Sequence, residues 1–181
     1  MIDYATKIYD ATRWAIANDD KEEMDVGMGV DVAIRHIRGS DCVYFIGNGG
    51  SLAACAHMAN DLSLAHKRAI DLSSAANITC IANDFGFENI FNYQLKWQFN
   101  ADFENVIIAL SCSGNSKNII NAVEAFRDKA TIITFTGFDK GNALRGLGHL
   151  NFHVPSNSYG VVQLAHEAIL HCIIDKIAGI Y

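Results

Sequence analysis

Two apolar runs in this chain each end in a loop of small residues that is followed by a helical pattern. The run at 43–46 leads into Gly-Asn-Gly-Gly-Ser at 47–51, and the run at 106–110 leads into Ser-Cys-Ser-Gly-Asn-Ser at 111–116. Glycine lets the backbone approach a ligand closely, and the first turn of a helix offers free N–H groups to an anion. The sequence therefore predicts an α/β protein that holds a ligand with a phosphate and several hydroxyls, such as a sugar phosphate.

The first loop does not match a standard nucleotide-binding motif. After Gly47 and Gly49, a dinucleotide fingerprint requires a glycine at position 52, where this chain has Leu52. No Gly-Lys-Ser/Thr follows, so the loop is not a P-loop either. Each loop also has a plain structural interpretation, a tight strand-to-helix turn at 47–51 and a polar helix cap at 111–116. The phosphate interpretation is favoured because the two loops occur together in one small chain.

Strand and helix patterns alternate along most of the chain. Strands are predicted at 42–46, 78–82, 105–110, 131–135 and 150–154, with a further short strand near 69–72. Helices are predicted at 3–18, 26–38, 51–65, 88–99, 116–128, 140–146 and 159–178. The runs at 106–110 and 131–135 are apolar or β-branched almost throughout, as in a parallel sheet buried on both faces. The sequence thus predicts a doubly wound α/β sandwich with ligands at the carboxyl ends of its strands.

The length of 181 residues suits a single domain, with N-terminal helices over 1–38 and an α/β core over 39–181. The two N-terminal helices precede the first predicted strand of the core. We expect them to dock against a second subunit. The alternative is that they cover the sheet of their own chain.

Charge and hydropathy exclude several classes of protein. The formal net charge is −6 and the basic residues are scattered, whereas nucleic-acid binding needs a basic face. No stretch has the roughly 18 consecutive apolar residues of a membrane helix, and the N-terminal segment lacks the apolar core of a signal peptide. The sequence predicts neither a nucleic-acid partner nor a membrane partner, and a cytoplasmic location.

Cysteine usage points to a reducing compartment. The five cysteines are Cys42, Cys55, Cys80, Cys112 and Cys172. Because their number is odd and no two form a C-x-x-C pair, neither a disulfide framework nor a cysteine zinc site is predicted. Cys42 and Cys80 lie in predicted apolar strands and are expected to be small core residues.

Potential metal ligands lie on two of the predicted helices. His57 and Asp61 are four residues apart, so they share one helix face, and Gln163, Glu167 and His171 follow one another at the same interval. Two imidazoles and a carboxylate suit a divalent metal such as zinc. The alternatives are a surface His–Asp pair and a solvated helix face, and the spacing does not show whether the two helices meet.

Several motifs together resemble those of one known family. They are Gly-Asn-Gly-Gly-Ser at 47–51 with His57 six residues past the serine, Ala-Asn-Asp-Phe-Gly-Phe at 82–87, the Ser/Cys loop at 111–116, Thr-Phe-Thr-Gly at 134–137, and Gln163 with His171 eight residues later. This set resembles the SIS (sugar isomerase) domain and, within that family, the sedoheptulose 7-phosphate isomerases, also called phosphoheptose isomerases. The likeness covers nearly the whole chain.

The resemblance implies a flavodoxin-like three-layer sandwich and a homotetramer with active sites between subunits. It implies that the sugar phosphate is held by Asn48, Gly49, Gly50, Ser51, Asp84, Ser111, Cys112, Ser113, Ser116 and Gln163. It implies one zinc ion per subunit at His57, Asp61, Gln163 and His171. The implied reaction converts sedoheptulose 7-phosphate to a manno-heptose 7-phosphate through an enediolate, with Asp61 as base and His171 as acid. In the family this step leads toward lipopolysaccharide or surface polysaccharide.

The chain departs from the family pattern at four positions. Asp61 replaces a glutamate, Ala65 an arginine, Cys112 a threonine, and Gly160 an aspartate three residues before the glutamine. The shorter Asp61 withdraws its carboxylate by roughly 1 Å, a displacement that can affect rate. Glu167, which lies between Gln163 and His171 in the sequence, is a hypothesis for a group that compensates for Asp61 or orients His171.

Two other functions stay open at this point. One is a SIS-fold regulatory or adaptor protein, like the relatives that bind the bacterial replication initiator, which do not need the His-Asp-Gln-His set. The other is an isomerase of a different sugar phosphate, which Ala65 and Gly160 leave possible. The full set of ligand-type side chains favours an enzyme over a regulator.

Overall fold

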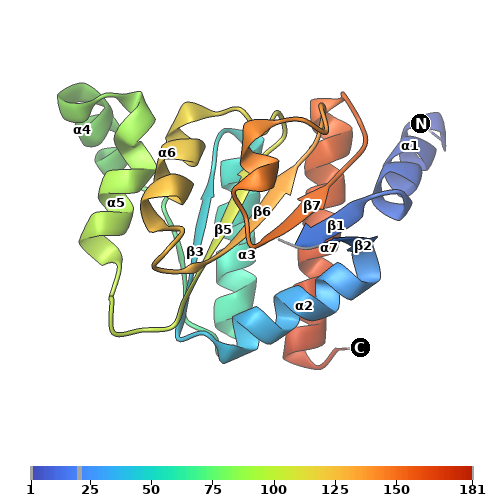
Figure 1. Cartoon of the computed structure of the whole chain (residues 1–181), viewed down its shortest axis with the longest axis horizontal. Coiled ribbons are helices and arrows are strands. Elements are labelled where there is room, and N and C mark those ends of the chain that lie inside the picture. The colour runs from blue at the N-terminus through green and yellow to red at the C-terminus, as the bar shows by residue number, and fades with distance from the viewer. Residues whose placement is uncertain (1, 20–21, 181) are drawn as a thin grey trace.

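One mixed β-sheet organises the protein (Figure 1). The structure is a computed structural model that describes residues 2–19 and 22–180. Within these residues seven strands are ordered β2-β1-β7-β6-β5-β3-β4. They are β1 (Ile16–Asp19), β2 (Glu23–Asp25), β3 (Cys42–Gly47), β4 (Ala69–Asp71), β5 (Asn105–Ser111), β6 (Thr131–Thr136) and β7 (Leu150–His153). The five strands from β7 to β4 pair in parallel, and β1 is antiparallel to both of its neighbours.

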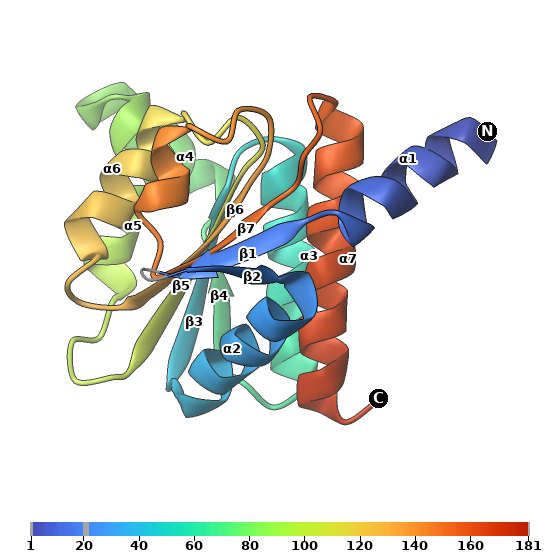
Figure 2. The ribbon, with the colours of Figure 1, turned by 45° about the vertical axis from the view of Figure 1, so that its right-hand side comes forward.

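Helices cover both faces of the sheet, so the predicted α/β sandwich is confirmed. They are α1 (Ile2–Arg13), α2 (Val26–Gly39), α3 (Gly50–Leu64), α4 (Ala75–Phe85), α5 (Ile90–Gln98), α6 (Lys117–Phe126) and α7 (Tyr159–Ala178), with 3₁₀ helices η1 (Phe87–Asn89) and η2 (Ala143–Gly146). Figure 2 shows α2, α3 and α7 on one side of the sheet and α4, α5 and α6 on the other. None of the described helices is both long and apolar enough to cross a bilayer.

The alternation of side chains along each strand builds a separate hydrophobic core on each face. Val43 and Phe45 of β3 point into the core beneath α2, α3 and α7, whereas Tyr44 and Ile46 point into the core beneath α4, α5 and α6. All six residues of β3 are buried. A strand that is buried on both faces has a continuous apolar sequence, which is why the position of β3 was predicted closely.

The strand predicted at 78–82 is wrong, because these residues lie in α4. The Oγ atom of Ser74 caps this helix by accepting a hydrogen bond from the N–H of Asn77 at 3.5 Å. Ile78 and Ile81 are three residues apart and face the core together, a helical spacing. A short apolar run does not distinguish a strand from one turn of helix. The strand next to β3 is instead β4, at the place of the short strand predicted near 69–72.

The N-terminal region also differs from the prediction of two helices. The helix expected over 3–18 ends at Arg13, and Ile16 belongs to β1. Both β1 and β2, which were not predicted, extend the sheet beyond β7. α2 covers its own chain's sheet, because a Cβ atom on Gly29 would lie 2.3 Å from the Cβ of Ala17 in β1. α1 projects outward beside α7 (Figure 2) and leaves Tyr9 largely exposed.

The remaining differences are smaller. The helix predicted at 140–146 is only the 3₁₀ helix η2, and the helix predicted at 88–99 is divided into η1 and α5. Cys80, expected in a core strand, lies exposed on α4, whereas Cys42 is buried in β3 as expected. All five cysteines are free.

Two buried histidines on β7 and α7 make the fold sensitive to acid. Burial lowers the pKa of both His153 and His166 to about 4. In the unfolded chain their pKa is about 6.5, so the unfolded state takes up protons first. The stability that these neutral side chains contribute is therefore complete above about pH 6.5 and is lost as the pH falls toward 4.

We expect the free energy of unfolding, measured by urea denaturation, to fall between pH 7 and pH 5. The contribution of His166 alone has a slope of at most about 1.4 kcal/mol per pH unit. A His166→Asn variant, which cannot titrate, should show a shallower dependence on pH. Equal slopes for the variant and the original chain would contradict this assignment.

Candidate active site

The two small-residue loops lie side by side at the carboxyl ends of β3 and β5. These strands are neighbours in the sheet, and Gly47 at the end of β3 is paired with Leu110. Gly49 has a φ of 55°, a conformation that favours glycine, and α3 begins directly after it. Close packing also requires Gly47, since a Cβ atom there would lie 2.9 Å from the backbone of Ser51. The chain thus turns sharply and aims the first turn of α3 at the second loop.

The loops enclose a pocket of about 210 Å³, here called the sugar pocket. It is lined by Asn48, Ser51, Leu110, Ser111, Cys112, Ser113, Ser116, Tyr159 and Gln163. The Oγ atoms of Ser111 and Ser116 are 3.3 Å apart, and Ser51 Oγ is 3.9 Å from Cys112 Sγ. Burial raises the pKa of the Cys112 thiol, so this cysteine stays neutral rather than acting as a thiolate. Gly49 and Gly50 supply backbone at the entrance of α3.

Two residues of this site were missed by the sequence analysis. Asn118, buried in α6, exchanges two hydrogen bonds with Asn48: Asn48 Nδ2 donates at 2.9 Å and Asn118 Nδ2 donates back at 2.8 Å. This pair joins the two loops and fixes the Asn48 amide. Tyr159 lines the pocket from the start of α7. Both residues lie in the first turn of a helix that follows a strand, and this position is the sequence feature that could have identified them.

Asp84 is not brought to the sugar pocket. It is exposed on α4, where its carboxylate accepts hydrogen bonds from Asn83 Nδ2 at 2.8 Å and from Cys80 Sγ at 3.7 Å. Asp84 was expected to orient the sugar, and within this chain it does not line that pocket.

The expected metal ligands His57, Asp61 and His171 come together between α3 and α7. His57 Nε2 is 3.3 Å from Asp61 Oδ2, and His171 Nδ1 is 4.0 Å from the same oxygen. The two imidazole rings meet edge to face, with centroids 5.2 Å apart. The two helices therefore do meet, which the spacing alone left open.

The side chain of Gln163, the fourth expected ligand, contacts the start of α3. A Cβ atom built on Gly50 would lie 2.7 Å from Gln163 Nε2, so the amide rests on this glycine in the sugar pocket. The sugar pocket thus lies at the start of α3 and α7, and the His-Asp-His cluster lies farther along the same two helices.

The donor set fits a zinc ion. One ligand atom from each of His57, Asp61 and His171 lies within 4.8 Å of the others. Tetrahedral ligands about 2.1 Å from zinc are about 3.4 Å apart, so a small contraction of this cluster brings the three atoms to bonding distance. Three protein ligands with one open position are typical of a catalytic rather than a structural zinc site.

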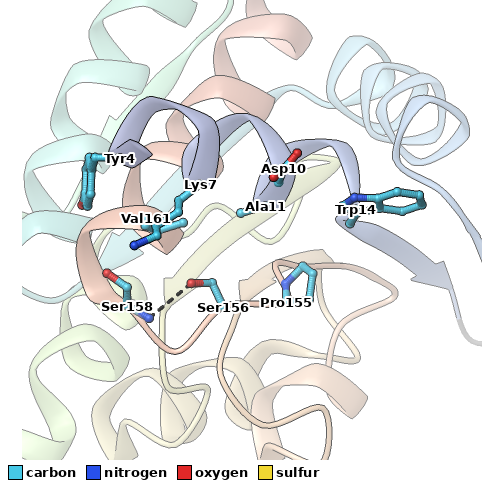
Figure 3. Close-up of a pocket in the computed structure, with 9 residues that line it drawn as sticks. All are labelled: Tyr4, Lys7, Asp10, Ala11, Trp14, Pro155, Ser156, Ser158 and Val161. Atoms are coloured by element: carbon cyan, nitrogen blue, oxygen red, sulfur yellow. Dashed lines mark hydrogen bonds between the residues drawn. The ribbon is translucent and has the colours of Figure 1, made fainter. Parts of the chain in front are cut away.

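A second hollow, of about 370 Å³, lies between α1 and the segment that joins β7 to α7 (Figure 3). Figure 3 shows Tyr4 and Lys7 of α1 opposite Ser156 and Ser158, and the backbone N–H of Ser158 donates to Ser156 Oγ at 3.3 Å. A Cβ atom on Gly160 would lie 2.4 Å from the Tyr4 hydroxyl. The tyrosine therefore occupies the space beside position 160, where the family pattern has an aspartate.

The comparisons with known proteins agree with this geometry. The family model described as "SIS domain" matches residues 8–137. The chain belongs to the SIS-domain family. A phosphoheptose isomerase from Shewanella sp. (strain ANA-3) is 32% identical over 163 residues, which cover 84% of this chain and 81% of the relative. Within the SIS family, the chain therefore groups with the phosphoheptose isomerases.

Solved structures give the same relationship. The phosphoheptose isomerase from Francisella tularensis superposes with a TM-score of 0.81 at 25% identity, covering 98% of this chain and 94% of that one. The one from Neisseria gonorrhoeae superposes with a TM-score of 0.75 at 27% identity, covering 85% of each chain. The fold of these phosphoheptose isomerases thus extends over nearly the whole chain.

Proposed function

We propose that this protein is an aldose–ketose isomerase that converts sedoheptulose 7-phosphate to D-glycero-D-manno-heptose 7-phosphate. The observation that carries the proposal is the continuity of the two sites. The hydroxyl-lined sugar pocket opens at the start of α3 and α7, and the His-Asp-His cluster lies farther along the same two helices. A phosphorylated sugar bound by its phosphate among Ser51, Ser111 and Ser116 can extend toward the cluster. The names of the relatives support the same activity.

The proposed chemistry is proton transfer between adjacent carbons of the sugar. Asp61 removes the proton from the hydroxyl-bearing carbon next to the carbonyl, and the C–H electron pair becomes the C=C bond of an enediolate. His171 exchanges the proton between the two oxygens, and Asp61 returns its proton to the neighbouring carbon. Zinc held by His57, Asp61 and His171 would supply positive charge for the enediolate oxygens.

The assembly and location are part of the proposal. Residues 1–181 form one SIS domain, and the protein acts in the cytoplasm as a homotetramer. Support for the tetramer comes from α1 and the residue that follows it, because Tyr9 is 61% and Trp14 is 64% exposed. Aromatic side chains of this size are enriched at protein interfaces. The alternative function, that of a regulatory protein, is disfavoured because such a protein does not need the His-Asp-His cluster.

A different sugar phosphate is the second candidate substrate. The observation that favours it is the position of the Tyr4 hydroxyl beside Gly160. Where the family pattern has the carboxyl group of an aspartate, this chain therefore presents a phenol.

Purified protein should be incubated with sedoheptulose 7-phosphate, unphosphorylated sedoheptulose and fructose 6-phosphate, and the products separated by anion-exchange chromatography. We expect turnover of sedoheptulose 7-phosphate alone. Turnover of fructose 6-phosphate instead would move the assignment to another isomerase.

A further inference from the structure

The side chain of Asn48, which lines the sugar pocket, is held by a buried residue that does not line it. Asn118 lies in the first turn of α6, is only 2% exposed and is not among the lining residues. The two amides exchange hydrogen bonds of 2.9 and 2.8 Å, and among residues 2–19 and 22–180 the Asn48 side chain makes no other hydrogen bond. The orientation of the Asn48 amide in the pocket therefore depends on Asn118.

The backbone of α6 decides which end of each amide is the oxygen. The N–H of Ile119 donates to Asn118 Oδ1 at 3.1 Å. Because an N–H needs an acceptor, this atom of Asn118 must be the amide oxygen and not the amide nitrogen. The reciprocal pairing then places Asn48 Nδ2 opposite Asn118 Oδ1, and Asn48 Oδ1 opposite Asn118 Nδ2. The polarity of the Asn48 amide is thus set by the protein before any ligand binds.

The pairing leaves Asn48 with binding capacity to spare. A carboxamide has two N–H donors and an oxygen with two lone pairs, and Asn118 uses one of each. One N–H and one lone pair of Asn48 therefore remain for a ligand. The backbone of Asn48 is also held, since its carbonyl accepts a hydrogen bond from the N–H of Ser51 at 3.0 Å. Asn48 thus offers a donor and an acceptor at fixed positions in the sugar pocket.

We propose that Asn118 is a positioning residue for the sugar phosphate, which acts by holding the Asn48 amide in the orientation that binds the ligand. The inference rests on the proposed function, because it takes a sugar phosphate as the ligand of this pocket. A group that is already ordered loses little conformational freedom on binding. A misplacement of about 1 Å can lower the rate by about 10²-fold. Loss of Asn118 should therefore weaken binding and turnover only while Asn48 is present.

The test is a double-mutant cycle with Asn118→Leu, Asn48→Ala and the variant that carries both changes. Leucine has nearly the shape of asparagine, so it fills the same space without an amide, and the melting temperature checks that each variant is folded. Two quantities are measured for sedoheptulose 7-phosphate. They are kcat/KM in the zinc-loaded protein, and the dissociation constant by calorimetry after removal of metal, which does not depend on turnover.

A matched control lies on the same helix. Asn121 of α6 donates from Nδ2 to the carbonyl of Glu88 at 3.2 Å and does not line the sugar pocket. Asn121→Ala also removes an asparagine hydrogen bond from α6. It should change kcat/KM and the dissociation constant less than about twofold, as for a surface substitution away from the site.

We expect Asn118→Leu to lower kcat/KM and to raise the dissociation constant at least about tenfold in the original chain. In the Asn48→Ala background the same change should alter both by less than about threefold, because residues that act through one another are not additive. A purely structural role of Asn118 would produce the same loss in both backgrounds. That result, or an Asn118→Leu variant with the affinity and kcat/KM of the original chain, would overturn the inference.

The two measured quantities separate this inference from the proposed function. If the original chain binds sedoheptulose 7-phosphate but does not convert it, the proposed function is wrong, and the cycle of dissociation constants alone decides the role of Asn118. If the original chain neither binds nor converts this sugar phosphate, both the proposed function and the inference are wrong.

Discussion

Replacing Asp61 by asparagine should lower kcat for isomerisation of sedoheptulose 7-phosphate by about 10²–10⁴-fold. Asparagine has the same shape but cannot accept the carbon-bound proton, and general-base catalysis by one side chain contributes about 10²–10⁴-fold. The same change removes the negative charge that His57 and His171 approach at 3.3 and 4.0 Å, so zinc affinity should fall as well. Steady-state kinetics and zinc content measure the two effects separately.

Two variants serve as controls for Asp61. Asp61→Glu keeps the carboxylate and restores the length of the family's residue, so its activity should be far higher than that of Asp61→Asn. Asp31→Asn removes a carboxylate from α2 that pairs with Lys176 and lies outside the cluster, so its kcat should be unchanged. If Asp61→Asn kept most of its activity in the zinc-loaded protein, Asp61 would not be the base.

Replacing Gly114 by alanine should cost roughly 2–5 kcal/mol of stability and raise KM for the sugar phosphate. Gly114 has a φ of 63°, where an L side chain is strained by about 1–2 kcal/mol. A Cβ atom there would also lie 1.8 Å from Asn142 Oδ1, a clash that adds the cost of overpacking. Asn142 caps η2 and donates to the carbonyl of Gly137, so its displacement disturbs the loop that carries Ser113.

The matched control is Gly146→Ala, in the same region of the chain. A Cβ atom on Gly146 meets nothing within 4 Å, and its φ is not in the left-handed region. Urea denaturation should show this variant within about 0.5 kcal/mol of the original chain, as for a surface substitution. A Gly114→Ala variant as stable as Gly146→Ala would mean that the loop accommodates a side chain by moving.

Local sequence patterns predicted the strands that are buried on both faces and the helices whose ends are clearly marked in the sequence. The bounds of α7 agree with the prediction at both ends, because an apolar pattern runs from Tyr159 to the left-handed Gly179. The strand β3 was predicted because it is buried on both faces. The N-terminal strands were missed because β1 is only four residues long and gains its order from pairing with β7, far away in the chain.

The site was predictable in its residue types but not in its connections. The i, i+4 spacing placed His57 and Asp61 on one face, yet only the packing of α3 on α7 brings His171 to them. The same packing puts the Gln163 amide on Gly50. The spacing of residues within one helix does not indicate which turn of a neighbouring helix they contact.

The most direct test of this account is conversion of sedoheptulose 7-phosphate by the purified protein in three states. The protein is assayed as prepared, after removal of metal by a chelator, and after zinc is returned. We predict product formation that is lost on chelation and recovered with zinc, while Asp61→Asn stays inactive throughout. Turnover that survives complete removal of metal, or a folded and zinc-loaded protein that forms no product, would contradict it.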